Sequence, residues 1–371
     1  MRKLCIIAIA LLGIGMSWTP MKANACAIPV FRYALERWPP YPYNIVVFYK
    51  GSLDKKEEKA IEALEDSHSN LVGWYVNLND KLPEELVPIW KEEKKKATLP
   101  WLVVRYPGQF WDVVDNKTFW SGPFDLQKLS EVTDSPARTQ FVKSMLSGVS
   151  TVWVYIEGDD KKNDNAKIKA LEDNLALIKK EVVLPPEAFE EVSQGEMAGS
   201  VPLKIDFEII RLSRNDPKEQ VFLNMLMKTE RDLSKHKNEP MLFPIFGQGR
   251  ALWALIGKGI NDETIDRTCV FMLGNCSCEI KDLNPGVDLL INADWFGSVS
   301  NVLSVSDTPV TLVGLTSATP VKETQQKELQ EETAKDNPDG FSLYKAIVAA
   351  FLAIIIIVGI ASIIITQQRK D

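Results

Sequence analysis

The sequence has very few of the residues that hydrolases and metalloenzymes use most often in catalysis. It contains only two histidines, His68 and His236, and each stands beside a polar residue where a helix is expected to end. A catalytic histidine needs an orienting partner and a cleft, so both are interpreted as solvated side chains. The HExxH motif of zinc proteases and the GxSxG motif of serine hydrolases are both absent. Nothing in the sequence therefore argues for a hydrolase.

Basic side chains are outnumbered by acidic ones, 43 to 50, which gives the chain a net charge of −7. The two ends are basic and together contribute +5, so residues 26–344 carry a charge of −12. An acidic domain repels phosphate backbones, and this argues against nucleic acid as a partner. These 319 residues are more than one hydrophobic core comfortably holds, so two domains are expected.

The C-terminal region contains a long uncharged apolar run, which the rest of the chain lacks. Twenty consecutive residues, Ala346 to Ile365, are almost wholly apolar. A helix of that length spans about 30 Å, the thickness of the hydrocarbon core of a bilayer. We therefore predict one transmembrane helix over residues 344–366 and a tail over residues 367–371, whose basic side chains fit the cytoplasmic side. The run has no ionisable residue, so it is interpreted as an anchor and not as a transport path.

The N-terminus is typical of a signal peptide over residues 1–25. A basic start and a short apolar run precede Ala23-Asn24-Ala25, which supplies the small-x-small cleavage pattern. Cleavage leaves Cys26 as the first mature residue, and a lipid on Cys26 is an alternative, although Ala23 stands where lipoprotein signals usually have leucine. The two ends together predict a single-pass protein of a bacterial inner membrane, with a periplasmic ectodomain and a cytoplasmic C-terminus.

Between the two ends, apolar strands and amphipathic helices follow the same order twice. The first copy is expected over residues 44–147, with strands at 44–50, 70–78, 101–106 and 118–120 and helices at 54–67, 83–96 and 124–132. The second copy is expected over residues 150–300, with strands at 151–157, 201–212, 241–246 and 251–256 and helices at 166–182, 216–233 and 261–273. Residues 185–200 are interpreted as a long loop of the second copy.

This order, with a proline opening the third strand, resembles the thioredoxin fold over about residues 42–132 and again in the second half. The resemblance implies an α/β protein with two tandem thioredoxin-like domains plus one C-terminal transmembrane helix. It also implies that Pro100 and Pro240 occupy the cis-proline position. Redox-active members carry Cys-x-x-Cys where the first strand enters the first helix, because the helix N-terminus lowers the thiol pKa there. Residues 50–54 and 157–161 occupy those positions and contain no cysteine, which excludes thiol–disulfide exchange at both.

The mature chain has four cysteines, Cys26, Cys269, Cys276 and Cys278, and the last three lie within ten residues. Outside the cytoplasm an even number of cysteines is first interpreted as structural disulfides. Four cysteines allow three pairings, and the sequence does not choose among them. The favoured arrangement joins Cys26 to one of the other three, which would connect the two ends of the folded region.

The late cysteine cluster leaves two further hypotheses open, besides simple buried thiols. One is a thiol-redox site at Cys276-Ser277-Cys278, against which the preceding helix C-terminus and Glu279 argue because both raise a thiol pKa. The other is a metal or iron–sulfur site made with Cys269 and Cys26, against which the tight Cys-x-Cys spacing argues. No catalytic residue, cofactor or metal is assigned on the sequence.

The absence of cysteine at both thioredoxin-type positions favours a binding or accessory module, with the membrane and a protein of a membrane complex as partners. Residues 26–43 form an N-terminal segment, and residues 301–343 are expected to be a β segment followed by a polar, flexible stalk. Trp111 and Trp120 bracket a loop, and besides core packing they are candidates for a protein-binding surface. The sequence names neither a reaction nor a partner.

Overall fold

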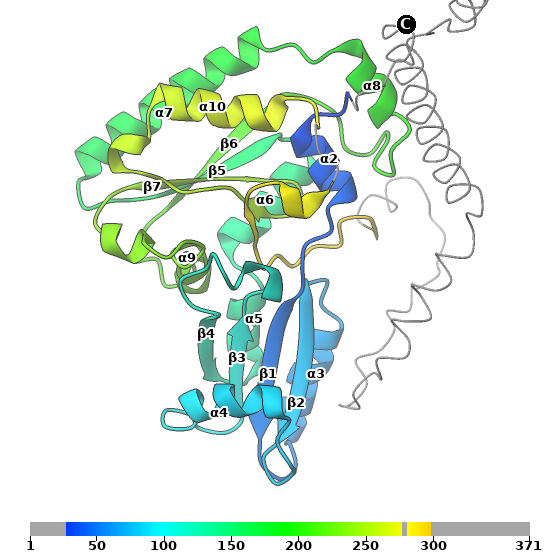
Figure 1. The fold of residues 1–371 in the computed structure, drawn as a ribbon, viewed down its shortest axis with the longest axis vertical. Helices are drawn as coiled ribbons and strands as arrows, with labels where there is room; N and C mark the ends of the chain where they lie inside the picture. The colour runs from blue at the N-terminus through cyan, green and yellow to red at the C-terminus, as the bar shows by residue number, and fades with distance from the viewer. Residues whose placement is uncertain (1–26, 277–279, 298–371) are drawn as a thin grey trace, which may run out of the picture. The chain divides into compact units, whose positions relative to one another are not determined.

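The computed structural model describes residues 27–276 and 280–297. They form a mixed α/β structure with two β-sheets inside one compact unit (Figure 1). The predicted α/β class is therefore confirmed. The signal peptide, Cys26, Cys278, the stalk, the apolar run from Ala346 to Ile365 and the tail all lie outside the described residues. Within those residues, no helix combines the length and the apolar character needed to cross a bilayer.

The first sheet has four strands in the order β2-β1-β3-β4. Its strands are β1 (Tyr43–Tyr49), β2 (Leu71–Asn77), β3 (Trp101–Arg105) and β4 (Thr118–Pro123). Strand β1 is parallel to β2 and antiparallel to β3, and β3 is antiparallel to β4. The helices of this half are α3 (Lys55–Glu65), α4 (Val87–Glu93) after the 3₁₀ turn η1 (Glu84–Leu86), and α5 (Leu126–Thr133). Because β1 is central and covered on both faces, it reads as one apolar run.

The second sheet repeats this order and extends it. Its strands are β5 (Thr151–Ile156), β6 (Phe207–Leu212), β7 (Met241–Phe246), β8 (Arg250–Ala251), β9 (Leu255–Ile256) and β10 (Val287–Asp288). The strand order is β10-β8-β7-β5-β6, with β9 also paired to β7. Strand β5 is parallel to β6 and antiparallel to β7, as β1 is to β2 and β3. The helices are α2 (Val30–Arg37), α6 (Pro136–Leu146), α7 (Lys161–Glu181), α8 (Pro186–Val192), α9 (Gln220–Leu226) and α10 (Asp262–Leu273).

Several boundaries in the second half differ from the sequence prediction. The expected loop over 185–200 contains helix α8, because consecutive prolines at its start preset the backbone for a first helical turn. The strand expected at 201–212 begins only at Phe207, and the helix expected at 216–233 is only α9. Helix α6, which begins at Pro136 with Ser135 as its N-cap, was not predicted.

The two sheets share one hydrophobic core. A single cluster of buried side chains contains Val47 and Val104 of the first sheet together with Val154 and Phe243 of the second. Phe141 of α6 belongs to the same cluster. This cluster continues from one half into the other, and two further clusters of buried side chains belong to the second half and to the first half respectively. The orientation of the first sheet therefore depends on packing against the second.

Helix α2 is held in the second half by a buried arginine. The Arg32 guanidinium pairs with Glu36 at 2.7 Å and donates hydrogen bonds to the carbonyl oxygens of Val201 and Met197. The segment before the helix forms an antiparallel bridge in which Pro29 lies opposite Asn275. These contacts tie the start of the described chain to the segment that follows α10.

Asp288 of β10 joins the linker before β1 to the second sheet. Its side chain is 2 % exposed and pairs with Arg250 of β8 at 2.9 Å and with Lys281. The backbone N–H of Tyr41 donates to the same carboxylate at 2.8 Å, and the Tyr43 hydroxyl donates to the Asp288 carbonyl oxygen. One carboxylate therefore neutralises two buried cations and fixes the chain that leads into the first sheet.

We expect Asp288→Asn to lower the free energy of unfolding by about 3–5 kcal/mol, because it leaves Arg250 and Lys281 as buried charges without their counterion. Denaturant unfolding followed by circular dichroism measures this change. The control is Asp173→Asn, which removes a carboxylate that is 64 % exposed and paired with Lys169. This control should cost less than about 1 kcal/mol. Equal losses in the two variants would contradict the role given to Asp288.

Candidate functional site

The turn from β1 into α3 holds a carboxylate at the helix N-terminus. Asp54 is the N-cap, and its side chain accepts hydrogen bonds from the backbone N–H groups of Lys56 at 2.7 Å and Glu57 at 2.9 Å. The Glu57 side chain completes a capping box by accepting from the Asp54 N–H. The hydrogen bonds from Glu57 and Lys56 hold the Asp54 pKa below its usual range. An acidic cap therefore already satisfies this positive helix end.

Pro100 lies beside this turn. The register pairs Phe48 of β1 with Trp101 of β3, so Pro100 adjoins the C-terminal end of β1. The Leu99–Pro100 peptide bond is cis, at the position that the sequence predicted. The Pro100 carbonyl oxygen accepts a hydrogen bond from the Phe124 N–H at 3.0 Å, which anchors the start of β3 to the chain after β4.

The corresponding turn of the second half differs in one respect. Asp160 caps α7 as Asp54 caps α3, with hydrogen bonds from two backbone N–H groups. The peptide bond before Pro240, however, is not cis, so this part of the prediction is wrong. The Pro240 ring packs against Gly158, where an added Cβ would lie 2.8 Å from the proline Cδ. Glycine at 158 thus leaves the space that this proline occupies.

The two described cysteines are buried and belong to the core around α10. Cys269 is 2 % and Cys276 is 4 % exposed. Cys269 is a free thiol, so it takes no part in a disulfide. Burial, followed by the charge of Asp266, raises the pKa of Cys269 to about 12, which keeps it protonated and non-nucleophilic at neutral pH. This burial argues against Cys269 as a redox residue.

A metal site receives no support from the described residues, because nowhere in residues 27–276 and 280–297 do three or more His, Cys, Asp or Glu side chains converge. Cys26 and Cys278 lie outside those ranges, so the four-cysteine metal or iron–sulfur hypothesis stays a prediction. Neither His68 nor His236 belongs to a cluster of three or more possible metal ligands among the described residues. His236 pairs with Glu239 at 2.8 Å, on an exposed turn.

Trp111 forms a cationic and aromatic cluster next to β3. Its indole N–H donates to the Tyr106 carbonyl oxygen at 2.9 Å, which fixes the ring. The Arg105 guanidinium lies 4.8 Å and the Lys117 ammonium 4.6 Å from the centre of that ring. Trp111 and Trp120, the two tryptophans predicted for a surface, are both partly buried and pack against the shared core. The sequence identified Trp111 but not the two cations, which only the pairing of β3 with β4 brings to it.

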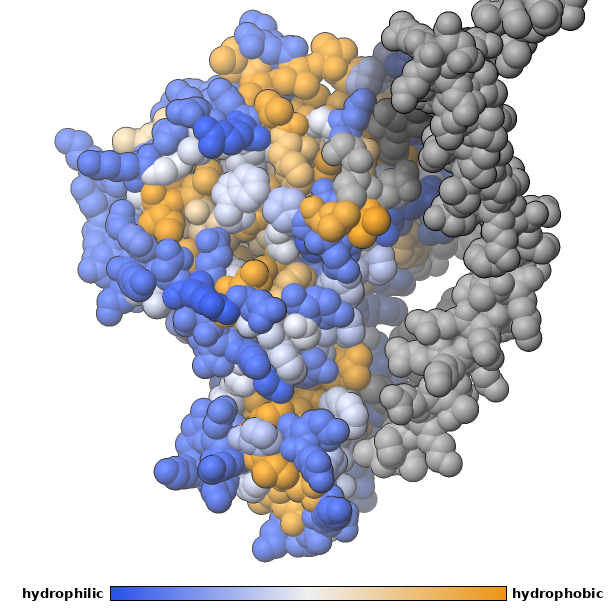
Figure 2. Space-filling view, in the orientation of Figure 1, coloured by the Kyte–Doolittle hydropathy of each residue, from blue (hydrophilic) through white to orange (hydrophobic). Residues whose placement is uncertain are grey.

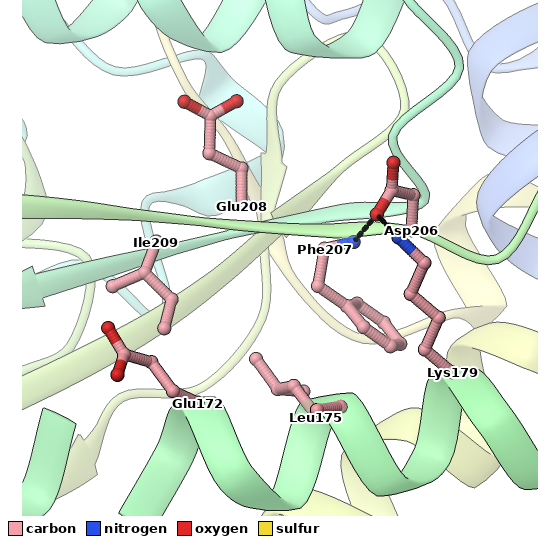
Figure 3. A pocket seen from close by; sticks show the side chains of 8 residues that line it. Glu172, Leu175, Lys179, Asp206, Phe207, Glu208 and Ile209 are labelled. Atoms are coloured by element: carbon pink, nitrogen blue, oxygen red, sulfur yellow. Dashed lines mark hydrogen bonds and ion pairs between the residues drawn. The ribbon is translucent and has the colours of Figure 1, made fainter. Parts of the chain in front are cut away.

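A groove of about 410 Å³ lies between α7 and the edge strand β6 (Figure 3). Leu175, Phe207 and Ile209 supply its apolar surface. An ion pair between Lys179 and Asp206 at 2.5 Å stands at one end. Lys179 and Lys204 hold the Asp206 pKa below its ordinary value, against the opposing effect of burial. The groove offers apolar contact and an open strand edge, but no nucleophile with a partnered base.

Comparisons with known proteins do not assign this chain to a family. A scan of protein-family models and a search of curated proteins both gave no match to the sequence. Chemically, the described residues offer acidic helix caps, buried thiols, a cation–aromatic cluster and an apolar groove. These groups suit binding, and none of them forms a nucleophile–base–orienter arrangement of the kind that catalysis requires.

We expect Cys269 to resist alkylation in the native protein. With a pKa of about 12, only about one Cys269 thiol in ten thousand is ionised at pH 8, and the thiolate is the reactive form. Mass spectrometry of the Cys269 peptide after iodoacetamide treatment should show full labelling in guanidinium chloride and almost none without it. The native rate should rise about tenfold per pH unit above pH 8. Rapid native labelling at pH 8 would contradict the assigned burial.

Proposed function

We propose that this protein is a membrane-anchored, extracytoplasmic binding or accessory module of thioredoxin-like architecture without redox activity. The observation that carries the proposal is the chemistry of the two strand-to-helix turns. At both, an aspartate that caps the helix stands where a redox-active domain would carry its thiols. Cys269 and Cys276 support the same conclusion, because both are buried and neither belongs to one of these turns.

The strand arrangement supports the thioredoxin-like part of the proposal. In the first sheet β3 is antiparallel to its neighbours and β1 pairs in parallel with β2, which is the βαβ-plus-hairpin pattern of that fold. A cis bond before Pro100 stands at the start of β3. The second sheet repeats the order through β6, β5, β7 and β8. The absent cis bond at Pro240 makes the second half the less typical copy.

The location is proposed from the two ends of the chain. The signal-like residues 1–25 and the apolar run from Ala346 to Ile365 support a periplasmic location for the described region and a cytoplasmic location for the short tail. The partners that follow are the bilayer itself and a protein of a membrane complex. The net charge of −12 over residues 26–344 argues against nucleic acid.

We further propose that Cys26 forms a disulfide with Cys278. The antiparallel bridge places Pro29 opposite Asn275, and a hydrogen bond from the Cys276 N–H to the Ile28 carbonyl oxygen continues it. In the sequence, Cys26 precedes Pro29 by three residues and Cys278 follows Asn275 by three residues, and this equal spacing favours Cys278 as the partner.

Peptide mapping without reduction tests this pairing. On protein taken from its own membrane, we expect one linked pair of peptides that contains Cys26 and Cys278. A diacylglyceryl group on Cys26, or a link from Cys26 to Cys276, would contradict the proposal. Elemental analysis of the same sample should find no stoichiometric zinc or iron, since a disulfide removes two of the four thiolates that a metal would need.

The central proposal is tested by thiol–disulfide exchange. We expect the purified full-length chain to reduce insulin no faster than dithiothreitol alone, because both turns lack thiols. A Ser52→Cys/Lys55→Cys variant provides the matched control. It installs Cys-x-x-Cys at the start of α3 and keeps the Asp54 cap, so it should gain measurable exchange activity. Turnover by the unmodified protein would overturn the binding-module assignment, and an inert variant would count against thioredoxin-like geometry at this turn.

A further inference from the structure

The guanidinium of Arg105 has no ionic or hydrogen-bond partner among the described residues. Arg105 ends β3 and is half-buried, and its Nε atom is enclosed without a hydrogen bond. Burial lowers the pKa of Arg105, and Glu92 of α4 is the nearby carboxylate whose charge opposes that effect. The other buried arginines are fully engaged: Arg32 pairs with Glu36, Arg250 pairs with Asp288, and Arg138 donates hydrogen bonds to backbone carbonyl oxygens. Arg105 is therefore a half-buried cation that forms no ion pair with a described residue.

A second cation reinforces the first. The Tyr106 N–H donates to the Lys117 carbonyl oxygen at 2.9 Å, and this pairing places Lys117 next to Arg105. Both side chains lie within 5 Å of the centre of the Trp111 ring. The Lys117 side chain is exposed. Two positive groups thus converge on one ring, although residues 26–344 as a whole carry a charge of −12, and this defines a local site for an anion.

Exposed apolar side chains share the same face of the first sheet. Asn44 of β1 pairs with Val72 of β2 on one side and with Arg105 of β3 on the other, so these three side chains lie on the same face of the sheet. Trp74 follows Val72 by two residues along β2 and therefore lies on that face as well. Val72 is 37 % and Trp74 is 40 % exposed. Helix α4 covers the opposite end of this face, where Ile89 packs over Phe48. In Figure 2, apolar patches interrupt the polar surface around the first sheet, in the lower part of the view.

We propose that this surface, formed by Arg105, Trp111, Lys117, Val72 and Trp74, binds an acidic, apolar segment of a partner protein. A carboxylate of the segment pairs with the Arg105 guanidinium, and neighbouring apolar side chains cover Val72 and Trp74. Charge complementarity selects this occupant, because a guanidinium held against an aromatic ring presents its outer N–H groups to a planar carboxylate. The inference rests on the proposed binding function and specifies the chemistry of its ligand.

The test measures binding of a fluorescein-labelled peptide, Gly-Leu-Glu-Leu-Glu-Leu-Gly, to the purified full-length chain in non-ionic detergent by fluorescence anisotropy. A peptide with glutamine in place of glutamate is the matched ligand. We expect the glutamate peptide to bind, Arg105→Gln to weaken its affinity by about tenfold, and Lys117→Gln by about threefold. Glu92→Gln should tighten binding, since it removes the carboxylate that competes for Arg105.

The control variant is Arg267→Gln, which removes an arginine of α10 that is 69 % exposed and pairs with Glu263. It should leave peptide affinity unchanged. Equal binding of the glutamine peptide, or an equal loss in Arg267→Gln, would overturn the proposal. So would displacement of the peptide by inorganic phosphate at concentrations where acetate has no effect, because the site would then accept a phosphate group in preference to a carboxylate.

If Arg105→Gln does not fold, the opposite shifts expected for Lys117→Gln and Glu92→Gln still decide the outcome, because both of those side chains are exposed. If neither shift occurs, the anion site is wrong. That failure would leave the insulin assay unaffected, so it is distinguishable from failure of the proposed non-redox function.

Discussion

The structure depends on the neutralisation of buried positive charge at Asp288. Two cations, Arg250 and Lys281, and the N–H of Tyr41 all converge on this one carboxylate. Burial of ions is costly, and the cost is offset only where pairing and hydrogen bonding are complete. Here completeness requires the linker before β1, strand β8 and strand β10 to be in place together. The contact therefore couples formation of the second sheet to the position of the first.

Two other buried arginines act in the same way through backbone carbonyl groups. Arg138 donates to the carbonyl oxygens of Val132 at 2.7 Å and Leu290 at 3.3 Å, so it joins the end of α5 to the chain after β10. Burial lowers the pKa of Arg138 to about 10, yet the group stays protonated at neutral pH. Arg32 likewise connects α2 to residues around Val201. Segments without regular structure are thus fixed by guanidinium groups that satisfy several carbonyl groups at once.

The sequence predicted the strands well where both faces are buried, because β1, β5 and β7 read as continuous apolar runs. It also contained a usable signal for Cys269, which follows Ile265 by four residues and so shares the buried face of α10. The sequence could not show that the peptide bond is cis before Pro100 but not before Pro240. The surroundings of Pro240 include its packing against Gly158, and this is a tertiary contact. The Arg105 cluster was also invisible, because cross-strand register brings its members together.

A shared core has a consequence for the proposed binding surface. The affinity of a surface rises when its groups are already fixed before the partner arrives, since less conformational entropy is then lost on binding. The ring of Trp111 is fixed by Tyr106, whose own hydroxyl donates to the carbonyl oxygen of Met225 in α9 at 2.5 Å. The second half thereby holds the platform on which Arg105 and Lys117 converge. In this arrangement the second half supports the geometry of the first, and the first presents the ligand-binding groups.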